Sequence, residues 1–259
     1  MFDKTARITF FCFISLMAFF NCNAAVETLK GSDGAETKVR VDWMPASFFR
    51  KPAQTVLIGH GSGGVTANHA YWAKTVNGWG YNAVVIDHYT LRGITRHTGQ
   101  VAISTIDRAR DFGLVSSWVQ KQPWHQGKMA IVGFSQGGSG LMSYVNEKVM
   151  TQLEVLPVGP TPVAAVVAIY PGCGIQTPPD KPSMPVLMLL AEKDDLAPAE
   201  LCKPVVDPLY KVKVLKNATH SFDEKIPSTV KLIFTQRYSQ DSVDEARDSL
   251  QAFLAQHLK

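Results

Sequence analysis

The chain has 259 residues, of which 46% are hydrophobic and 19% charged, and its formal net charge is +4 at pH 7. This composition is typical of a globular protein and excludes a disordered or fibrous chain. Lys and Arg residues form no block along the sequence, which argues against a nucleic-acid partner. The length suits one α/β sheet with flanking helices, folded as a single domain.

The N-terminal segment has the pattern of an export signal. A short basic region precedes the apolar run from Ile8 to Phe20, which is too short to cross a bilayer as a helix but has the length of a signal-peptide core. The small residues Ala24 and Ala25 predict cleavage between them. We therefore expect a signal peptide at 1–24 and a mature domain at 25–259 that is periplasmic or secreted, with no stable membrane insertion after cleavage. The alternative is an uncleaved membrane anchor.

Short apolar runs are spaced along the mature domain. They are continuously apolar, which is typical of parallel strands covered on both faces. A later strand, Lys211 to Leu215, alternates, and the Pro-rich stretches Leu156 to Pro162 and Gln176 to Pro185 predict surface loops. The continuous runs are Thr55 to Ile58, Ala83 to Ile86, Met129 to Val132, Ala164 to Ile169 and Val186 to Leu190.

Helical periodicity appears between these runs. In Val101 to Val119, small and apolar residues recur at three-and-four spacing and charged residues fill the other side. The stretch Ser139 to Asn146 is compatible with a helix, and Ser242 with Glu245 predicts a capping box at the start of the last helix. Strands that alternate with helices predict a doubly wound, mostly parallel α/β sheet, which is the fold class that we expect.

The cysteines agree with an oxidising compartment. Two of the four, Cys12 and Cys22, fall in the expected signal, which leaves Cys173 and Cys202 in the mature domain. An even pair in an exported protein predicts one disulfide. Two buried free thiols are the alternative, because the sequence does not place their Cα atoms. The chain has neither a C-x-x-C pair nor an H-E-x-x-H motif, so we expect no zinc site.

The sharpest motif is a G-x-S-x-G pattern at 133–137, centred on Ser135. It follows the run Met129 to Val132 and precedes the helix-compatible stretch Ser139 to Asn146. A serine at such a strand-to-helix turn lies on a sharp, strained elbow with its Oγ exposed at the top of the sheet. This context predicts that Ser135 is a catalytic nucleophile. A Gly-rich turn whose serine only caps the following helix is the alternative.

A serine hydroxyl needs a base to take its proton, and the base is usually a histidine that a carboxylate orients. In α/β-hydrolases the chain order is serine, acid, histidine. Downstream of Ser135 only His220 and His257 remain. His257 lies near the chain end, whereas His220 lies in a polar loop after a late strand, so we expect His220 to be the base. The acid must follow an intervening strand, where Asp194 and Asp195 both qualify.

Acyl transfer also needs hydrogen-bond donors for the oxyanion that develops in the reaction. In this fold the residue after the nucleophile, here Gln136, supplies one backbone N–H, and the loop after an early strand supplies the other. The Gly-rich loop from His60 to Gly64 follows Thr55 to Ile58, so we assign the second donor to Ser62. Phosphate binding is the alternative for such a loop, but the G-x-x-x-x-G-K pattern is absent. The mechanism requires neither a metal nor an organic cofactor.

At these residues the sequence resembles the dienelactone hydrolase family of α/β-hydrolases, from about Val39 to the C-terminus. The resemblance implies that the acid is the first aspartate of its pair, Asp194. Related exported members also pair cysteines at the positions of Cys173 and Cys202. The resemblance rests on His60 to Gly64, Asp87 with Arg92 and Gly93, Gly133 to Gly138, Tyr170 to Cys173, Glu192 to Asp195 and His220 to Phe222.

One residue departs from the family pattern. Dienelactone hydrolases carry a cysteine nucleophile, whereas this chain has Ser135, in a motif similar to that of broad-specificity carboxylesterases and thioesterases. We therefore expect hydrolysis of a small-molecule carboxylic ester or lactone, and not of dienelactone itself. A thioesterase or peptidase with the same triad, and a non-catalytic binding protein that kept the fold, are the alternatives.

The signals for substrate recognition are weaker. Four residues follow a strand end and favour an acidic acyl group if they border the pocket: His88, Tyr89, Arg92 and Arg96. A solvated basic loop is the alternative. Trp124 and Tyr170 either line an apolar pocket or pack within the protein.

Overall fold

The computed structural model describes residues 23–30, 36–45, 52–94, 103–153, 163–202, 207–225 and 234–259. The expected signal core at Ile8 to Phe20, the loop at Leu156 to Pro162 and Arg96 lie outside the described residues. The expected cleavage site between Ala24 and Ala25 lies within the first strand. No helix in the described ranges is long and apolar enough to span a membrane.

A single sheet of eight strands forms the centre of the molecule, in the order β1-β2-β4-β3-β5-β6-β7-β8. The strands β1 and β2 are antiparallel to each other, and β2 is antiparallel to β4; all other neighbouring strands are parallel. The expected doubly wound, mostly parallel α/β sheet is confirmed. The strands are β1 (Asn23–Lys30), β2 (Glu36–Met44), β3 (Ala53–Gly59), β4 (Asn82–Asp87), β5 (His125–Phe134), β6 (Val163–Ile169), β7 (Val186–Ala191) and β8 (Tyr210–Leu215).

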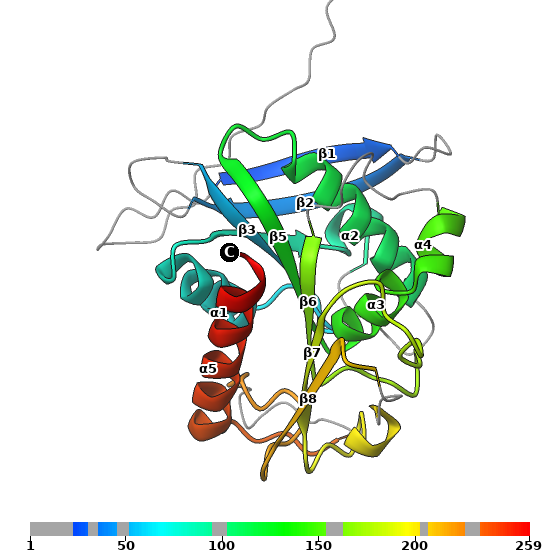
Figure 1. Ribbon diagram of the computed structural model, residues 1–259, viewed down its shortest axis with the longest axis vertical. Coiled ribbons are helices and arrows are strands. Elements are labelled where there is room, and N and C mark those ends of the chain that lie inside the picture. Colours follow the sequence, from blue (N-terminus) through cyan, green and yellow to red (C-terminus); the bar gives the residue numbers. More distant parts are fainter. Residues whose placement is uncertain are drawn as a thin grey trace, which may run out of the picture.

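Helices cover both faces of this sheet (Figure 1). The helices α1 and α5 pack on one face, and α2, α3 and α4 pack on the other. Two short 3₁₀ helices, η1 and η2, follow β4 and β7. The bounds are α1 (Ala67–Gly78), η1 (Thr90–Arg92), α2 (Thr105–Val119), α3 (Gln136–Tyr144), α4 (Glu147–Leu153), η2 (Ala199–Cys202) and α5 (Gln240–His257).

The continuous apolar runs become strands because both of their faces are covered. All six residues of β4 are buried, and successive side chains enter opposite layers: Val84 and Ile86 pack with α2 and α3, while Ala83 and Val85 pack with α1. Side chains alternate across a strand, so a two-sided core requires an apolar residue at every position. The edge strand β8 has one free side and is mostly half-buried or exposed.

Two helix starts differ from the expected ones. The last helix begins at Gln240, where Ser239 is the N-cap and its Oγ accepts from the N–H of Ser242; the expected capping box of Ser242 with Glu245 is wrong, because Ser242 already lies inside the helix. The helix α2 begins at Thr105, capped by Ser104, later than Val101.

Parallel strands bring distant parts of the chain to one edge. The chain leaves β3, β5, β7 and β8 at their carboxyl ends, which lie at one edge of the sheet, with β6 between β5 and β7. Binding and catalytic residues of open α/β sheets gather at that edge. The loop from His60 to Gly64, Ser135, Asp194 and His220 each follow one of these four strands.

Candidate active site

Ser135 lies on a tight turn between β5 and α3. Its backbone has φ 49° and ψ −116°, a conformation that L-residues rarely adopt and that stores strain at functional sites. Two glycines make the turn sterically allowed. A Cβ added at Gly133 would lie 2.5 Å from the carbonyl oxygen of Gly137, and one added at Gly137 would lie 2.6 Å from that of Gly59. No other residue fits at either position without moving the backbone.

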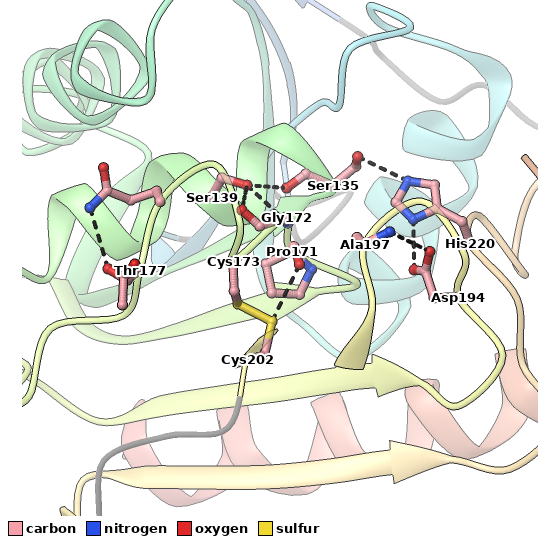
Figure 2. Close-up of a disulfide and its surroundings, with 11 residues drawn as sticks. Ser135, Ser139, Pro171, Gly172, Cys173, Thr177, Asp194, Ala197, Cys202 and His220 are labelled. Carbon is pink, nitrogen blue, oxygen red and sulfur yellow. Dashed lines mark hydrogen bonds and ion pairs between the residues drawn. A yellow bond between two sulfur atoms is a disulfide. The ribbon is translucent and has the colours of Figure 1, made fainter. Parts of the chain in front are cut away.

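The turn places the Ser135 hydroxyl against His220 (Figure 2). The Nε2 atom of His220 lies 3.0 Å from the Ser135 Oγ, and its Nδ1 atom lies 2.7 Å from the Asp194 Oδ2. A carboxylate only accepts hydrogen bonds, so Nδ1 carries the ring proton and Nε2 is free to accept the serine proton. The imidazole is held between the rings of Tyr170 and Phe234 and is almost completely buried.

The carboxylate of Asp194 is fixed at both oxygens. While Oδ2 accepts from His220, Oδ1 accepts from the backbone N–H groups of Leu196, at 3.0 Å, and Ala197, at 2.7 Å. Asp195, which was equally placed in the sequence, is exposed and accepts instead from the N–H of Thr235.

The Gly-rich loop after β3 runs directly over Ser135. A Cβ added at Gly61 would lie 3.0 Å from the Cβ of Ser135, so only a glycine allows this approach. Ser62 follows in the same loop and lines the cavity in front of Ser135. Gln136 is the first residue of α3, where the backbone N–H groups of a helix have no intrahelical acceptor and carry partial positive charge.

A cavity of about 110 Å³ opens beside the Ser135 hydroxyl. Its size suits a small group, since pockets for drug-sized ligands are several times larger. Glu224 is the one Asp, Glu, Lys or Arg among the described residues that line it. The lining residues are Gly61, Ser62, Gly63, Gly64, Thr66, Asn68, His69, Phe134, Ser135, Tyr170, Leu196, His220, Ser221, Glu224 and Phe234.

Comparison with known families identifies the chain. The dienelactone hydrolase family matches residues 44–258. The chain belongs to the dienelactone hydrolase family. Members of this family hydrolyse ester-type bonds, so the protein is a carboxylic-ester hydrolase by family. No curated protein matches the sequence.

Solved structures with the same fold include several hydrolases. A dienelactone hydrolase from Anabaena variabilis ATCC 29413 superposes with a TM-score of 0.60 at 15% identity, covering 92% of this chain and 99% of that one. A dienelactone hydrolase-like promiscuous phosphotriesterase from metagenomic libraries has a TM-score of 0.67 at 16% identity, with 91% and 99% covered. An esterase from Pyrococcus furiosus has a TM-score of 0.66 at 15% identity, with 93% and 94% covered. At these identities the likeness shows the α/β-hydrolase fold.

The disulfide expected in this dienelactone hydrolase family member is present. Cys173 and Cys202 are bonded, with their Cα atoms 5.1 Å apart. The bond joins the loop after β6 to η2, which follows the loop that carries Asp194 (Figure 2). The disulfide lies beside the candidate site, and neither cysteine is one of the candidate catalytic residues.

Of the basic residues after β4, the two that the structure describes, His88 and Arg92, do not line the cavity. His88 Nδ1 lies 2.7 Å from Asp111 Oδ2. The two terminal nitrogens of the Arg92 guanidinium donate to the same carboxylate, at 2.8 and 2.9 Å. The two side chains turn toward α2 because the buried carboxylate of Asp111 needs hydrogen-bond donors there, one of which is the charged guanidinium of Arg92. Trp124 stacks on Trp43 at a centroid distance of 4.6 Å, so it packs and is not a lining residue.

Burial keeps the histidines around the loop neutral. Burial lowers the pKa of His69 and of His88 to about 4 and lowers the pKa of His60 well below its ordinary value. Burial also raises the pKa of Tyr170 well above its ordinary value. His69 and Tyr170 line the cavity, so the wall that they form is uncharged at neutral pH.

A buried carboxylate behind this wall was not found from the sequence. Asp223 accepts hydrogen bonds from Asn68 Nδ2 and Trp72 Nε1, at 2.7 Å each, and from the Tyr170 hydroxyl at 2.7 Å. Asn68 and Tyr170 line the cavity. The carboxylate of Asp223 therefore holds two side chains of the cavity wall in place. Its donors are separated from it by 53 to 155 residues, and no local pattern signals such a contact.

The described residues contain no cluster of His, Cys, Asp and Glu side chains that could hold a metal ion.

Proposed function

We propose that the protein is an exported serine hydrolase that cleaves small carboxylic esters or lactones through an acyl-enzyme. One observation carries the proposal: the continuous hydrogen-bond chain from Ser135 Oγ through His220 to Asp194. Nucleophile and base within hydrogen-bond reach, with the base oriented by a third group, is the signature of a serine activated for acyl transfer.

In the proposed reaction His220 Nε2 takes the proton of Ser135 as Oγ attacks the ester carbonyl carbon. The tetrahedral intermediate collapses when the C–O bond to the alcohol breaks, and His220 returns the proton to the departing alkoxide. A water molecule then attacks the acyl-enzyme and gives its proton to His220. The second intermediate releases the carboxylic acid as Ser135 Oγ regains the proton.

The backbone N–H groups of Ser62 and Gln136 are the proposed donors to the oxyanion. Gln136 N–H lies at the positive end of α3, and Ser62 lies in the loop that passes over Ser135. Donors that are held in place before the reaction stabilise the transition state without a cost of reorganisation.

The cavity favours a small, uncharged acyl group. Its volume is about 110 Å³, its aromatic wall is neutral, and its described charged side chain is the acidic Glu224. A carboxylate on the acyl group would be repelled by Glu224 and would find no lysine or arginine among the described lining residues. We therefore propose a neutral acyl group, in place of the acidic one that basic residues at the border of the pocket would have favoured.

Export remains a proposal that rests on the N-terminal pattern, with residues 1–24 as signal peptide and 25–259 as the mature domain. The disulfide is compatible with an oxidising compartment. The full chain expressed in a bacterial host would be fractionated and its intact mass measured. A periplasmic or secreted product that begins at Ala25 supports the proposal, and a membrane-bound product of full mass contradicts it.

The activity is tested with a fluorophosphonate probe and with p-nitrophenyl esters of increasing acyl length. Wild type is expected to be labelled and to turn over the short esters, and Ser135→Ala is expected to lose both. The matched control is Ser143→Ala, on the same helix, where the hydroxyl bonds Thr105. A folded wild type without labelling or turnover would contradict the proposal, and thioester or peptide turnover above that of esters would redirect it.

A further inference from the structure

Arg108 is a buried cation beneath the Gly-rich loop. It lies on α2 and is 1% exposed. The side chain packs closely on α3, because a Cβ added at Gly140 would lie 2.7 Å from the Cβ of Arg108. Its NH1 atom donates to the carbonyl oxygen of His60 at 2.8 Å, and NH2 donates to the hydroxyl of Tyr89 at 2.8 Å. The guanidinium is therefore fixed at both of its terminal nitrogens.

Two longer contacts connect Arg108 to both proposed oxyanion donors. Its NH2 atom lies 3.4 Å from the carbonyl oxygen of Gly61 and 3.4 Å from the side-chain Oε1 of Gln136. The Gly61 carbonyl and the Ser62 N–H belong to one peptide group, which is planar. The same carbonyl oxygen lies 2.6 Å from His60 Nδ1, and Arg108 also holds the carbonyl of His60. Arg108 and His60 together therefore fix the direction of the Ser62 N–H.

The charge of Arg108 is not cancelled by a direct ion pair in the described part of the chain. Its acceptors there are carbonyl, phenol and amide oxygens. The nearby carboxylate of Asp111 bonds Arg92 and His88 instead. In a buried site of low polarity such a charge acts strongly on its neighbours. Held at the Gly61 carbonyl, it draws electron density toward the oxygen and makes the Ser62 N–H a stronger donor.

We propose that Arg108 is a positioning residue for the oxyanion hole, which orients and polarises the Gly61–Ser62 peptide and holds the side chain of Gln136. This inference rests on the proposed function, because it assumes that Ser62 and Gln136 bind an oxyanion. Arg108 acts through the loop and touches no substrate. Its contribution is to the transition state, where negative charge appears on the oxygen, and not to substrate binding.

The test compares Arg108→Met and Arg108→Lys with wild type. We measure kcat and KM on a short p-nitrophenyl ester, and the inhibition constant of a trifluoromethyl ketone that forms a tetrahedral adduct with the serine. For Arg108→Met we expect kcat to fall by roughly 10- to 100-fold, somewhat less than for loss of a direct oxyanion donor, with KM nearly unchanged. The inhibition constant rises by the same factor as kcat/KM falls. Arg108→Lys keeps a charge but reaches fewer acceptors, so its values lie between those of wild type and Arg108→Met.

The control for loss of packing is Val115→Ala, a fully buried position of α2. It lowers the melting temperature and leaves kcat and the inhibition constant near their wild-type values. The proposal is overturned if either Arg108 variant, folded, retains wild-type kcat and inhibition constant, or if KM alone changes. Should Arg108→Met not fold, Arg108→Lys decides. Failure of the proposed function is seen separately, because wild type itself would then not be labelled or inhibited.

Discussion

The carboxylates of Asp194 and Asp195 belong to consecutive residues and bond different partners. Asp194 lies 2.7 Å from the Nδ1 atom of His220, and its second oxygen is held by backbone N–H groups. Asp195 is exposed and accepts from the N–H of Thr235. One acid thus contacts the histidine, and the other accepts from the backbone of Thr235.

This difference predicts unequal effects of the same substitution. Asp194→Asn replaces an acceptor by an amide that can donate to Nδ1, which leaves the ring proton on Nε2 and blocks proton transfer from Ser135. We expect kcat to fall by about 10³- to 10⁴-fold, with little loss of folding. Asp195→Asn is the matched control and stays close to wild type. Esterase kinetics on the two purified variants check this, and equal effects would contradict the assignment of the acid.

A second prediction concerns the acyl preference. Glu224→Gln removes the described carboxylate of the cavity wall, so an ester with an anionic acyl group gains relative to a neutral one. At the distances within such a cavity we expect a relative gain of about 1 kcal/mol, or roughly fivefold in kcat/KM. The ratio of rates on p-nitrophenyl hemisuccinate and p-nitrophenyl butyrate measures it. Glu200→Gln, on the surface helix η2, should leave the ratio unchanged, and the same ratio in both variants would refute the role of Glu224.

The disulfide predicts a loss of stability that is larger than the loss of activity. Cys173 and Cys202 close a loop of 29 residues, and chain entropy assigns to such a loop about 3–4 kcal/mol. The double variant Cys173→Ala/Cys202→Ala should therefore melt several degrees lower, measured by circular dichroism, while kcat stays within severalfold of wild type. A loss of activity in a variant that remains fully folded would instead place the bond within the catalytic machinery.

The buried histidines predict that stability falls in mild acid. The pKa of His69 is about 4 in the folded protein against 6.5 for the free side chain, so below pH 6.5 the unfolded chain binds a proton that the folded protein does not. Stability is therefore retained above pH 6.5 and lost as the pH falls toward 4, by roughly 3 kcal/mol for this residue. His60 and His88, whose pKa values are lowered as well, act in the same direction.

Urea unfolding at a series of pH values measures this effect. His69→Gln should reduce the slope of unfolding free energy against pH between 4 and 6.5 by about 1.4 kcal/mol per pH unit, equivalent to one proton. His257→Gln, at the partly exposed end of α5, should change the slope less. An unchanged slope in His69→Gln would mean that the residue is protonated in the folded protein.

Several features of the protein follow from the sequence because they are local. A run such as Val186 to Leu190 is apolar at every position, which only a strand covered on both faces can use. The glycines around Ser135 mark a turn that admits no Cβ, as the contacts of Gly133 and Gly137 show. Together they predicted a tight turn at Ser135, and the order of residues along the chain predicted His220 as its partner, whose Nε2 atom lies 3.0 Å from the Ser135 Oγ.

Other features were decided only by the tertiary structure. The antiparallel pairing of β1 and β2 at one edge of the sheet was not predicted, although Val39, Val41 and Trp43 of β2 alternate with charged residues. The cap of α5 is Ser239 and not Ser242. The positions of Arg108 and Asp223 depend on which strands are neighbours in the sheet. Arg108 meets His60 across 48 residues of chain, and Asp223 meets Asn68 across 155. Buried polar groups must find partners wherever the fold brings them, and no short pattern records the choice.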